Sequence, residues 1–180
     1  MVGPGLGTAA WGRSLLSAVA SSEKPQVWDA DALNLVAQGF NVPSNAVLTP
    51  HPGEAARLLD TTSACVQADR LAALEALVER YQCVVVLKGA GTLIGAPNQS
   101  SLICEAGHPV MAGSGLGDVL AGLIGGLMAQ GLEGFKAATL AVWLHAKAGE
   151  SQAPLGRGLA AHDLIMPIRA LLEEQSPCLN

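Results

Sequence analysis

The sequence predicts an α/β fold with a mainly parallel central sheet. Short apolar segments that suit strands alternate along the chain with longer segments whose apolar residues recur at helical spacing. Residues 83–87 form an apolar run without polar alternation, which is typical of a central strand covered on both faces. Strands and helices that alternate in this way favour a parallel sheet with crossover helices.

The elements of the first half follow from periodicity and from capping residues. Residues 8–22 predict a helix in which Trp11, Leu15 and Val19 share one apolar stripe. Thr62 or Ser63 is expected to cap the last of four helices. The expected helices are 8–22, 32–38, 52–59 and 64–80, and the expected strands are 26–28, 46–49 and 83–87.

The second half predicts a hairpin followed by three helices. Residues 92–94 and 101–104 flank Pro97-Asn98-Gln99, a turn sequence between two apolar runs. A nearly uncharged helix is expected at 116–130, and its lack of charge predicts burial. Two further helices are expected at 135–150 and 159–174.

Composition bounds the size, partners and compartment of the protein. The 180 residues suit one domain, and we expect a single domain over 1–180. A net charge of −5 argues against a nucleic-acid surface. The longest apolar stretch, 119–129, is too short and too rich in glycine to span a bilayer. Four cysteines without a CxxC pair predict buried free thiols in a reducing compartment, and hence a cytoplasmic protein (Cys65, Cys83, Cys104 and Cys178).

A glycine-rich segment directly before the uncharged helix carries the strongest chemical signal. Gly115, Leu116 and Gly117 place backbone N–H groups at a helix start, where an anion such as phosphate is stabilised. Asp118 follows in the first turn and could accept a proton from a hydroxyl in phosphoryl transfer. Taken alone, the segment is equally well an ordinary turn in which Asp118 is a helix-start residue.

A second glycine-rich segment, Lys88-Gly89-Ala90-Gly91-Thr92, follows the expected central strand. Ligands of open α/β sheets bind outside the carboxyl ends of strands, so this segment suits a nucleotide lying against the backbone, with Thr92 as a hydrogen-bonding partner. The segment is not a Walker A loop. The alternative for Lys88 is a surface lysine at a strand end.

Polar residues also follow the two earlier strands. Asp29 and Asp31 could hold Mg²⁺ through water or cap the next helix; a cap or structural role is favoured for Asp29, and Asp31 is left open. His51 lies between two prolines that restrict its backbone, which suits a ligand contact as well as a structural role. Glu54 is either a metal-water ligand or a helix-start carboxylate.

One further loop, Gly3-Pro4-Gly5-Leu6-Gly7, has the composition of a turn after a strand. Only two residues precede it, so we expect the strand that feeds it to be absent or nearly so. All five loops should converge on one edge of the sheet and form one ligand site there.

In their order along the chain, from the Gly3 loop to the segment that ends at Asp118, the five motifs resemble those of ADP/ATP-dependent NAD(P)H-hydrate dehydratases, which belong to the ribokinase-like superfamily. The resemblance implies a three-layer α/β/α fold that lacks the amino-terminal part of the family's domain. It implies dehydration of the S form of hydrated NADH and NADPH. A nucleotide phosphorylates the ring hydroxyl, and elimination of phosphate restores the dinucleotide. ADP is favoured over ATP by the segment around His51, and Mg²⁺ is expected with the nucleotide.

The resemblance also implies roles for individual residues and partners. Gly5, His51 and Asp118 match positions that contact the hydrated dinucleotide, and Asp118 is the candidate catalytic base. It further implies a homo-oligomer and a functional link to an epimerase domain that this chain does not contain. The residues that would hold a metal ion are left open. The residues that match the nucleotide site are Lys88, Gly89, Ala90, Gly91, Thr92 and Gly117.

Two alternatives stay open on the sequence. One is a kinase of the same superfamily acting on a vitamin precursor or a sugar, since the glycine-rich segment before Asp118 serves both reactions. The other is an inactive nucleotide-binding fragment. The setting of His51 and the loop that begins at Lys88 favour the dehydratase.

Overall fold

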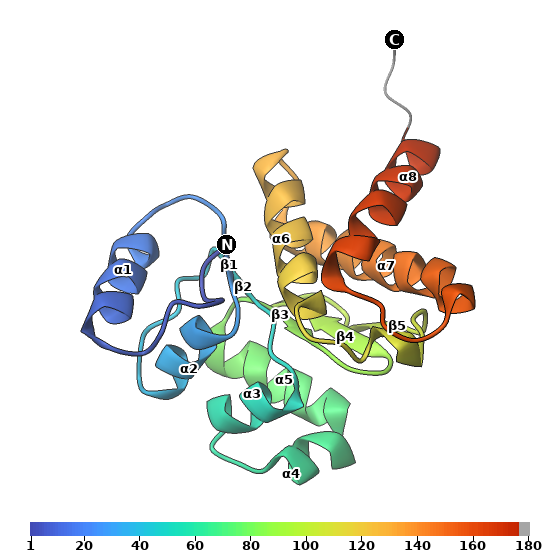
Figure 1. Ribbon diagram of the computed structural model, residues 1–180. Helices are drawn as coiled ribbons and strands as arrows, with labels where there is room; N and C mark the ends of the chain where they lie inside the picture. Colours follow the sequence, from blue (N-terminus) through green and yellow to red (C-terminus); the bar gives the residue numbers. More distant parts are fainter. Residues whose placement is uncertain (177–180) are drawn as a thin grey trace.

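The computed structural model describes residues 1–176, and its centre is one five-stranded sheet (Figure 1). The strands lie side by side in chain order: β1 (Gln26–Trp28), β2 (Ala46–Leu48), β3 (Val84–Leu87), β4 (Thr92–Gly95) and β5 (Leu102–Cys104). The pairs β1–β2 and β2–β3 are parallel, and the predicted hairpin β4–β5 continues the sheet in antiparallel fashion. Val2 forms a single parallel bridge to Trp28, so one residue of extended backbone feeds the first glycine-rich loop.

Helices cover both faces of the sheet, as predicted, and make three layers (Figure 1). One layer holds α1 (Ala10–Ala20), α2 (Asp31–Ala37), α3 (Pro52–Leu58), α4 (Ser63–Ala68) and α5 (Arg70–Tyr81). The opposite layer holds α6 (Leu116–Ala129), α7 (Gly134–Gln152) and α8 (Ile165–Gln175). Short 3₁₀ turns lie at Pro109–Met111, Ala153–Leu155 and Ala161–Leu164.

The three strands β1, β2 and β3 bury both of their faces. Trp28 and Leu48 point into the cluster with α2, α3 and α5, whereas Val27 and Val47 point into the cluster with α6 and α7. Because successive strand side chains point to opposite faces, a sheet covered on both sides needs apolar residues at every position. The uninterrupted apolar run that predicted a central strand is β3, the third strand of five.

The face of α1 that meets the protein differs from the predicted stripe. Trp11 is 68% exposed and Leu15 is 40% exposed, while Gly12 and Leu16 are buried. A side chain at position 12 would place its Cβ 2.3 Å from the carbonyl oxygen of Gly7, so glycine lets α1 approach the first loop. Close backbone contact therefore decides which side of the helix packs.

Two predicted helices begin or break elsewhere. The segment 64–80 is two helices, because Asp69 leaves helical geometry and its side chain caps α5 by accepting a hydrogen bond from the Ala72 N–H. Thr62 caps α4, as one of the two predicted choices. The segment 159–174 becomes helical only from Ile165, since Pro167 is tolerated in the first turn of a helix but not in its interior.

The cysteines are free thiols in the described part of the chain, but they are not all buried. Cys83 is buried, and burial raises the pKa of its thiol to about 12. Cys104 is half-buried, and Cys65 is exposed on the short helix α4, which corrects the expectation for that residue. Cys178 lies outside the described residues.

Within residues 1–176, no helix has the length and apolar character needed to cross a membrane.

A Gly12→Ala variant should be less stable than the wild type by about 1–3 kcal/mol, because the new Cβ overlaps the carbonyl oxygen of Gly7. The control is Gly122→Ala on α6, where an added Cβ meets no atom within 4 Å. Better helix propensity should make that variant more stable by about 0.5–1 kcal/mol. Urea unfolding measures the free energy of unfolding of both variants. An equal change in the two variants would contradict the close contact between α1 and the first loop.

Candidate active site

A cavity of about 770 Å³ lies at the carboxyl ends of β1, β2 and β3, where the sequence predicted a ligand site. The loops after these strands form one wall, and the start of α6 forms another. Gly5 does not line the cavity; it lies on an exposed turn of the first loop. The other predicted positions do line it: His51, Lys88, Gly89, Ala90, Gly91, Thr92, Gly115, Leu116, Gly117 and Asp118.

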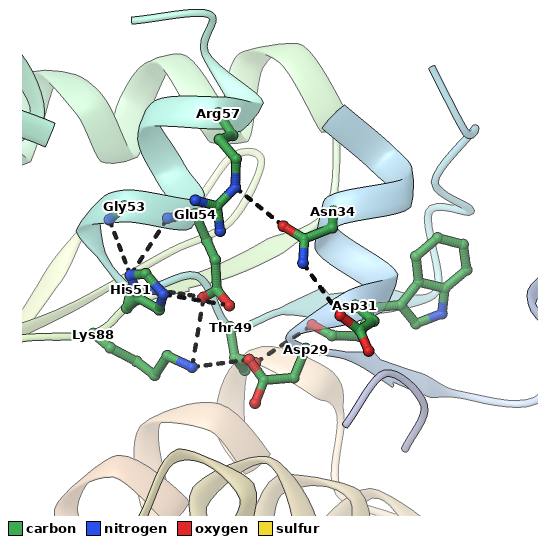
Figure 2. Close-up of polar contacts among 10 residues, drawn as sticks. Asp29, Asp31, Asn34, Thr49, His51, Gly53, Glu54, Arg57 and Lys88 are labelled. Atoms are coloured by element: carbon green, nitrogen blue, oxygen red, sulfur yellow. Dashed lines mark hydrogen bonds and ion pairs between the residues drawn. The ribbon is translucent and has the colours of Figure 1, made fainter. Parts of the chain in front are cut away.

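Lys88 is the centre of a charged cluster at the floor of the cavity (Figure 2). Its Nζ lies 2.8 Å from Asp29 Oδ1 and 3.8 Å from Glu54 Oε2. The Asp29 side chain is only 2% exposed and that of Lys88 18%. The alternative of a surface lysine is therefore wrong, because Lys88 neutralises a carboxylate that has almost no contact with solvent.

His51 and Glu54 hold each other at the start of α3 (Figure 2). His51 Nδ1 accepts hydrogen bonds from the backbone N–H groups of Gly53 and Glu54, while Glu54 Oε2 accepts one from the His51 N–H at 2.8 Å. This reciprocal cap fixes the ring, so the proton of the neutral imidazole is on Nε2. Nε2 lies 3.5 Å from Glu54 Oε1, and the half-exposed ring still faces the cavity.

The two aspartates after β1 make different contacts, and that of Asp29 agrees with the structural role that was one of its two favoured alternatives. The Asp29 side chain does not cap α2, whose cap makes no side-chain hydrogen bond, but pairs with Lys88. Asp31 accepts hydrogen bonds from the Gly7 N–H at 2.8 Å and from Asn34 Nδ2 at 3.3 Å. Asp31 therefore ties the first glycine-rich loop to α2 and makes no cap hydrogen bond to that helix.

The start of α6 lies close to the Lys88 side chain. Gly115 is the residue before the helix, with a φ of 81° that favours glycine. A Cβ at Gly117 would lie 3.2 Å from Lys88 Nζ, so glycine lets the helix end approach the charged cluster. The Asp118 carboxylate is exposed and lines the cavity, and it forms no hydrogen bond or ion pair with the rest of residues 1–176. It is thus free to accept a proton.

The loop after β3 is held by its own residues. The Thr92 hydroxyl donates a hydrogen bond to the Gly89 carbonyl at 3.0 Å. Gly89 and Gly91 have φ values of 145° and 65°, in the region that favours glycine. The hydroxyl predicted to bind a nucleotide therefore closes the loop on itself, and the loop backbone faces the cavity.

Sequence reasoning missed two residues next to this site. Arg70, on α5, donates hydrogen bonds to carbonyls at the end of β3 and in the loop after it. His145, on α7, is buried at the cavity wall with Nε2 2.9 Å from the Leu116 carbonyl oxygen. Burial lowers the pKa of His145 and so favours the neutral ring that donates to this carbonyl. A lone histidine in an apolar helix was the signal available for His145, and Arg70 gave none.

The described residues contain no group of three or more His, Cys, Asp or Glu side chains that could hold a metal ion. A Mg²⁺ ion that arrives with a nucleotide is held largely by phosphate oxygens and water, so it needs no closed protein cage.

Comparisons with known proteins extend these observations. The sequence pattern of the family described as NAD(P)H-hydrate dehydratase matches residues 1–169. The bifunctional NAD(P)H-hydrate repair enzyme Nnr of Coxiella burnetii is 47% identical over 174 residues, covering 96% of this chain and 36% of that protein. The ADP-dependent (S)-NAD(P)H-hydrate dehydratase of Neisseria meningitidis is 41% identical over 185 residues, covering 95% of this chain and 62% of that protein.

A solved structure of a dehydratase also matches this fold. The ADP/ATP-dependent NAD(P)H-hydrate dehydratase of Bacillus subtilis, co-crystallised with ATP and Mg²⁺, superposes with a TM-score of 0.85 at 27% identity. The match covers 96% of this chain and 63% of that one. The chain thus spans about a third of the length of the bifunctional relative and under two thirds of the two dehydratases.

The three-layer fold, with strand-end loops and a glycine-rich helix start around one cavity, defines a protein of the ribokinase-like class. Within that class, the chain belongs to the NAD(P)H-hydrate dehydratase family.

Replacing Lys88 by methionine should lower the free energy of unfolding by about 3 kcal/mol, because Asp29 then stays buried without a counter-charge. The double variant Lys88→Met/Asp29→Leu removes both charges and should recover most of this loss. The exposed control Lys136→Met should change stability by less than about 0.5 kcal/mol. Urea unfolding of all four proteins measures the coupling, and a double variant no more stable than Lys88→Met would contradict it.

Acidification should lower the free energy of unfolding of the wild type by more than it lowers that of a His145→Gln variant. Since burial lowers the pKa of His145 below its ordinary 6.5, the unfolded chain binds more protons than the folded chain in the interval below that pH. The stabilising contribution is therefore complete above pH 6.5 and is lost as the pH falls through the folded-state pKa. The measurement is urea unfolding between about pH 7.5 and about pH 5.

The matched control is His162→Gln, since the His162 side chain is 80% exposed. This variant should keep the pH dependence of the wild type. If His145→Gln and the wild type lose the same free energy of unfolding on acidification, burial of His145 does not control the acid response.

Proposed function

We propose that the chain carries out ADP-dependent dehydration of the S form of hydrated NADH and NADPH, a repair of damaged nicotinamide nucleotides. The observation that carries this proposal is the convergence of three features in one cavity. These are the loop of residues 88–92, the amino-terminal end of α6 and the unpartnered Asp118 carboxylate. The activity for which the Neisseria meningitidis relative is named supports the choice of reaction and of ADP.

The nucleotide would lie between the loop after β3 and the start of α6. Backbone N–H groups of Gly115, Leu116 and Gly117 offer an anion hole for the transferring phosphoryl group, where the helix dipole adds partial positive charge. Gly89, Ala90 and Gly91 give the nucleotide close access to the backbone. Lys88 offsets part of the negative charge at the floor of the cavity, since its ammonium faces both Asp29 and Glu54.

The hydrated ring would bind on the His51 side, with its hydroxyl directed at Asp118. The carboxylate accepts the hydroxyl proton while the ring oxygen bonds to the terminal phosphorus of ADP, and AMP leaves. The carbon–oxygen bond then breaks, phosphate leaves with the bonding electrons, and a proton leaves the neighbouring ring carbon. The ring double bond is thereby restored. Gly5 lies on the first loop, outside the cavity lining. We keep it in the proposal as a substrate contact made from that loop.

Mg²⁺ bound to the nucleotide would supply positive charge at the phosphates. Carboxylates that could approach such an ion through water are Asp118 and, deeper in the cavity, Glu54. Asp29 is less suited, because its buried carboxylate is already paired with Lys88.

Further partners and the compartment also belong to this proposal. The free thiols of Cys65, Cys83 and Cys104 suit a reducing compartment, which supports a place in the cytoplasm. The bifunctional relatives support a functional link to an epimerase domain that acts on the same hydrated nucleotides. The family resemblance supports a homo-oligomer, and no nucleic-acid or membrane partner is proposed.

The experiment that tests the proposal measures recovery of the absorbance of reduced nicotinamide from hydrated NADH. The purified chain is incubated with ADP, with ATP or with neither. We expect recovery with ADP, slower recovery with ATP and none without nucleotide. Absence of recovery in all three arms contradicts the proposal, and a stable phosphorylated vitamin precursor or sugar would favour a kinase instead.

An Asp118→Asn variant should regenerate NADH at least about a hundredfold more slowly, because the amide cannot take the hydroxyl proton. Its affinity for ADP should stay within about threefold, since the anion hole is built from backbone groups. The control is Asp60→Asn, an exposed turn residue outside the cavity, which should keep the wild-type rate. Unchanged turnover by Asp118→Asn would remove the proton acceptor from the mechanism.

A further inference from the structure

Arg70 lies directly behind the loop that follows β3. It is the first residue of α5, on the layer opposite to α6, and it does not line the cavity. Its Nη1 donates to the Ala90 carbonyl, and its Nη2 lies 3.2 Å from the Leu87 and 3.5 Å from the Lys88 carbonyl oxygen. One guanidinium thus contacts three carbonyls within four consecutive residues.

Gly89 makes room for this side chain. A Cβ at Gly89 would lie 2.9 Å from Arg70 Nη2, whereas one at Gly91 would lie in ordinary contact with Nη1 at 4.0 Å and closer, at 3.3 Å, to the Ile103 side chain. Gly89 therefore serves the rear of the loop as well as its ligand face. The glycine directly after Lys88 is explained in part by Arg70, which lies on α5, earlier in the chain.

The contacts of Arg70 involve the backbone carbonyl groups at this point of the chain and not the N–H groups of the loop. Carbonyl oxygens of Leu87, Lys88 and Ala90 turn back to the guanidinium. The backbone N–H groups of Gly89, Ala90 and Gly91 have no hydrogen-bond partner among residues 1–176. A loop with its carbonyls turned away and its N–H groups free presents partial positive charge, the arrangement that binds anions in backbone nests.

Stability of α5 does not explain the position of Arg70. A cation in the first turn of a helix is unfavourable, because it faces the positive end of the helix dipole. Its Nε is buried without a partner, and burial lowers the pKa of the guanidinium because desolvation disfavours the charged form. These costs are offset by the contacts to the loop.

We propose that Arg70 is a positioning residue for the nucleotide, acting through the loop of residues 88–92, whose carbonyls it holds so that the loop N–H groups face the phosphates or ribose of ADP. This inference rests on the proposed function, because it assumes that a nucleotide occupies the loop. It predicts an effect on nucleotide affinity, separate from the chemical step at Asp118.

The test compares Arg70→Met, which removes every donor, with Arg70→Lys, which keeps a cation able to reach fewer carbonyls. The control is Arg80→Met on the same helix, where the guanidinium lies 5.7 Å from the Tyr81 ring and far along α5 from the loop. The dissociation constant for ADP is measured by calorimetry, which needs no turnover. The KM for ADP, the KM for hydrated NADH and kcat are measured in parallel.

We expect Arg70→Met to raise the dissociation constant and the KM for ADP by about tenfold or more, the size of one lost hydrogen bond to a charged group. Arg70→Lys should recover part of this loss, and Arg80→Met should behave as the wild type. The KM for hydrated NADH and kcat at saturating ADP should stay within about threefold in all variants. Amide hydrogen exchange should become faster at residues 89–92 in Arg70→Met and stay unchanged in the strands.

Four outcomes separate the proposals. A folded Arg70→Met variant with wild-type ADP affinity overturns the positioning role and leaves the proposed function intact. Losses shared equally by kcat, both KM values and hydrogen exchange throughout the sheet also overturn it, since they would mark general destabilisation. A wild-type chain that binds ADP without regenerating NADH overturns the proposed reaction, while the affinities of the Arg70 variants still decide the positioning role. A wild-type chain that binds no nucleotide overturns both.

Discussion

The ion pair between Lys88 and Asp29 is the interaction around which the site is arranged. It joins the carboxyl ends of β3 and β1 across the intervening strand, and the carboxylate is only 2% exposed. A buried charge of this kind is tolerated because a partner lies at hydrogen-bond distance. The cavity floor, the cap of α3 and the approach of α6 all meet this pair (Figure 2).

This arrangement has a consequence for how an anionic ligand can be held. The positive charge of Lys88 is offset by the carboxylates of Asp29 and Glu54, so it adds little to the electrostatic potential that an anion in the cavity would meet. The remaining positive potential comes from backbone N–H groups at the start of α6 and in the loop after β3. Such groups are fixed by the fold, which makes the anion site depend on backbone geometry more than on side-chain charge.

Glycines make this backbone geometry possible at two different kinds of position. At Gly117 the missing side chain lets a helix end come within contact of Lys88, and at Gly12 it lets α1 contact the first loop. Asp31 then ties that loop to α2 through the Gly7 N–H. The site and the packing of the layer that holds α1 therefore share one requirement, which is close approach of main chain to its neighbours.

The sequence by itself determined the strands, most of the helices and the edge of the sheet where the loops converge. Apolar runs and glycine-rich turns report burial and backbone conformation directly, so β3 and the segment before Asp118 could be assigned without a structure. Asp69 was missed as a helix break because an aspartate suits both a cap and an exposed helical position. The exposed faces of Trp11 and Leu15 were missed because periodicity describes a stripe but not what covers it.

Only the tertiary structure decided which polar groups meet. Asp29 and Lys88 are 59 positions apart, and the ring of His145 reaches a carbonyl 29 positions away. Arg70 carries no motif, yet it contacts the loop that does. The physical reason is that local propensity and spacing fix where the chain turns, whereas pairing of distant donors and acceptors depends on how the layers pack. The roles of Asp29, Asp31 and Arg70 therefore follow from the fold and from no segment alone.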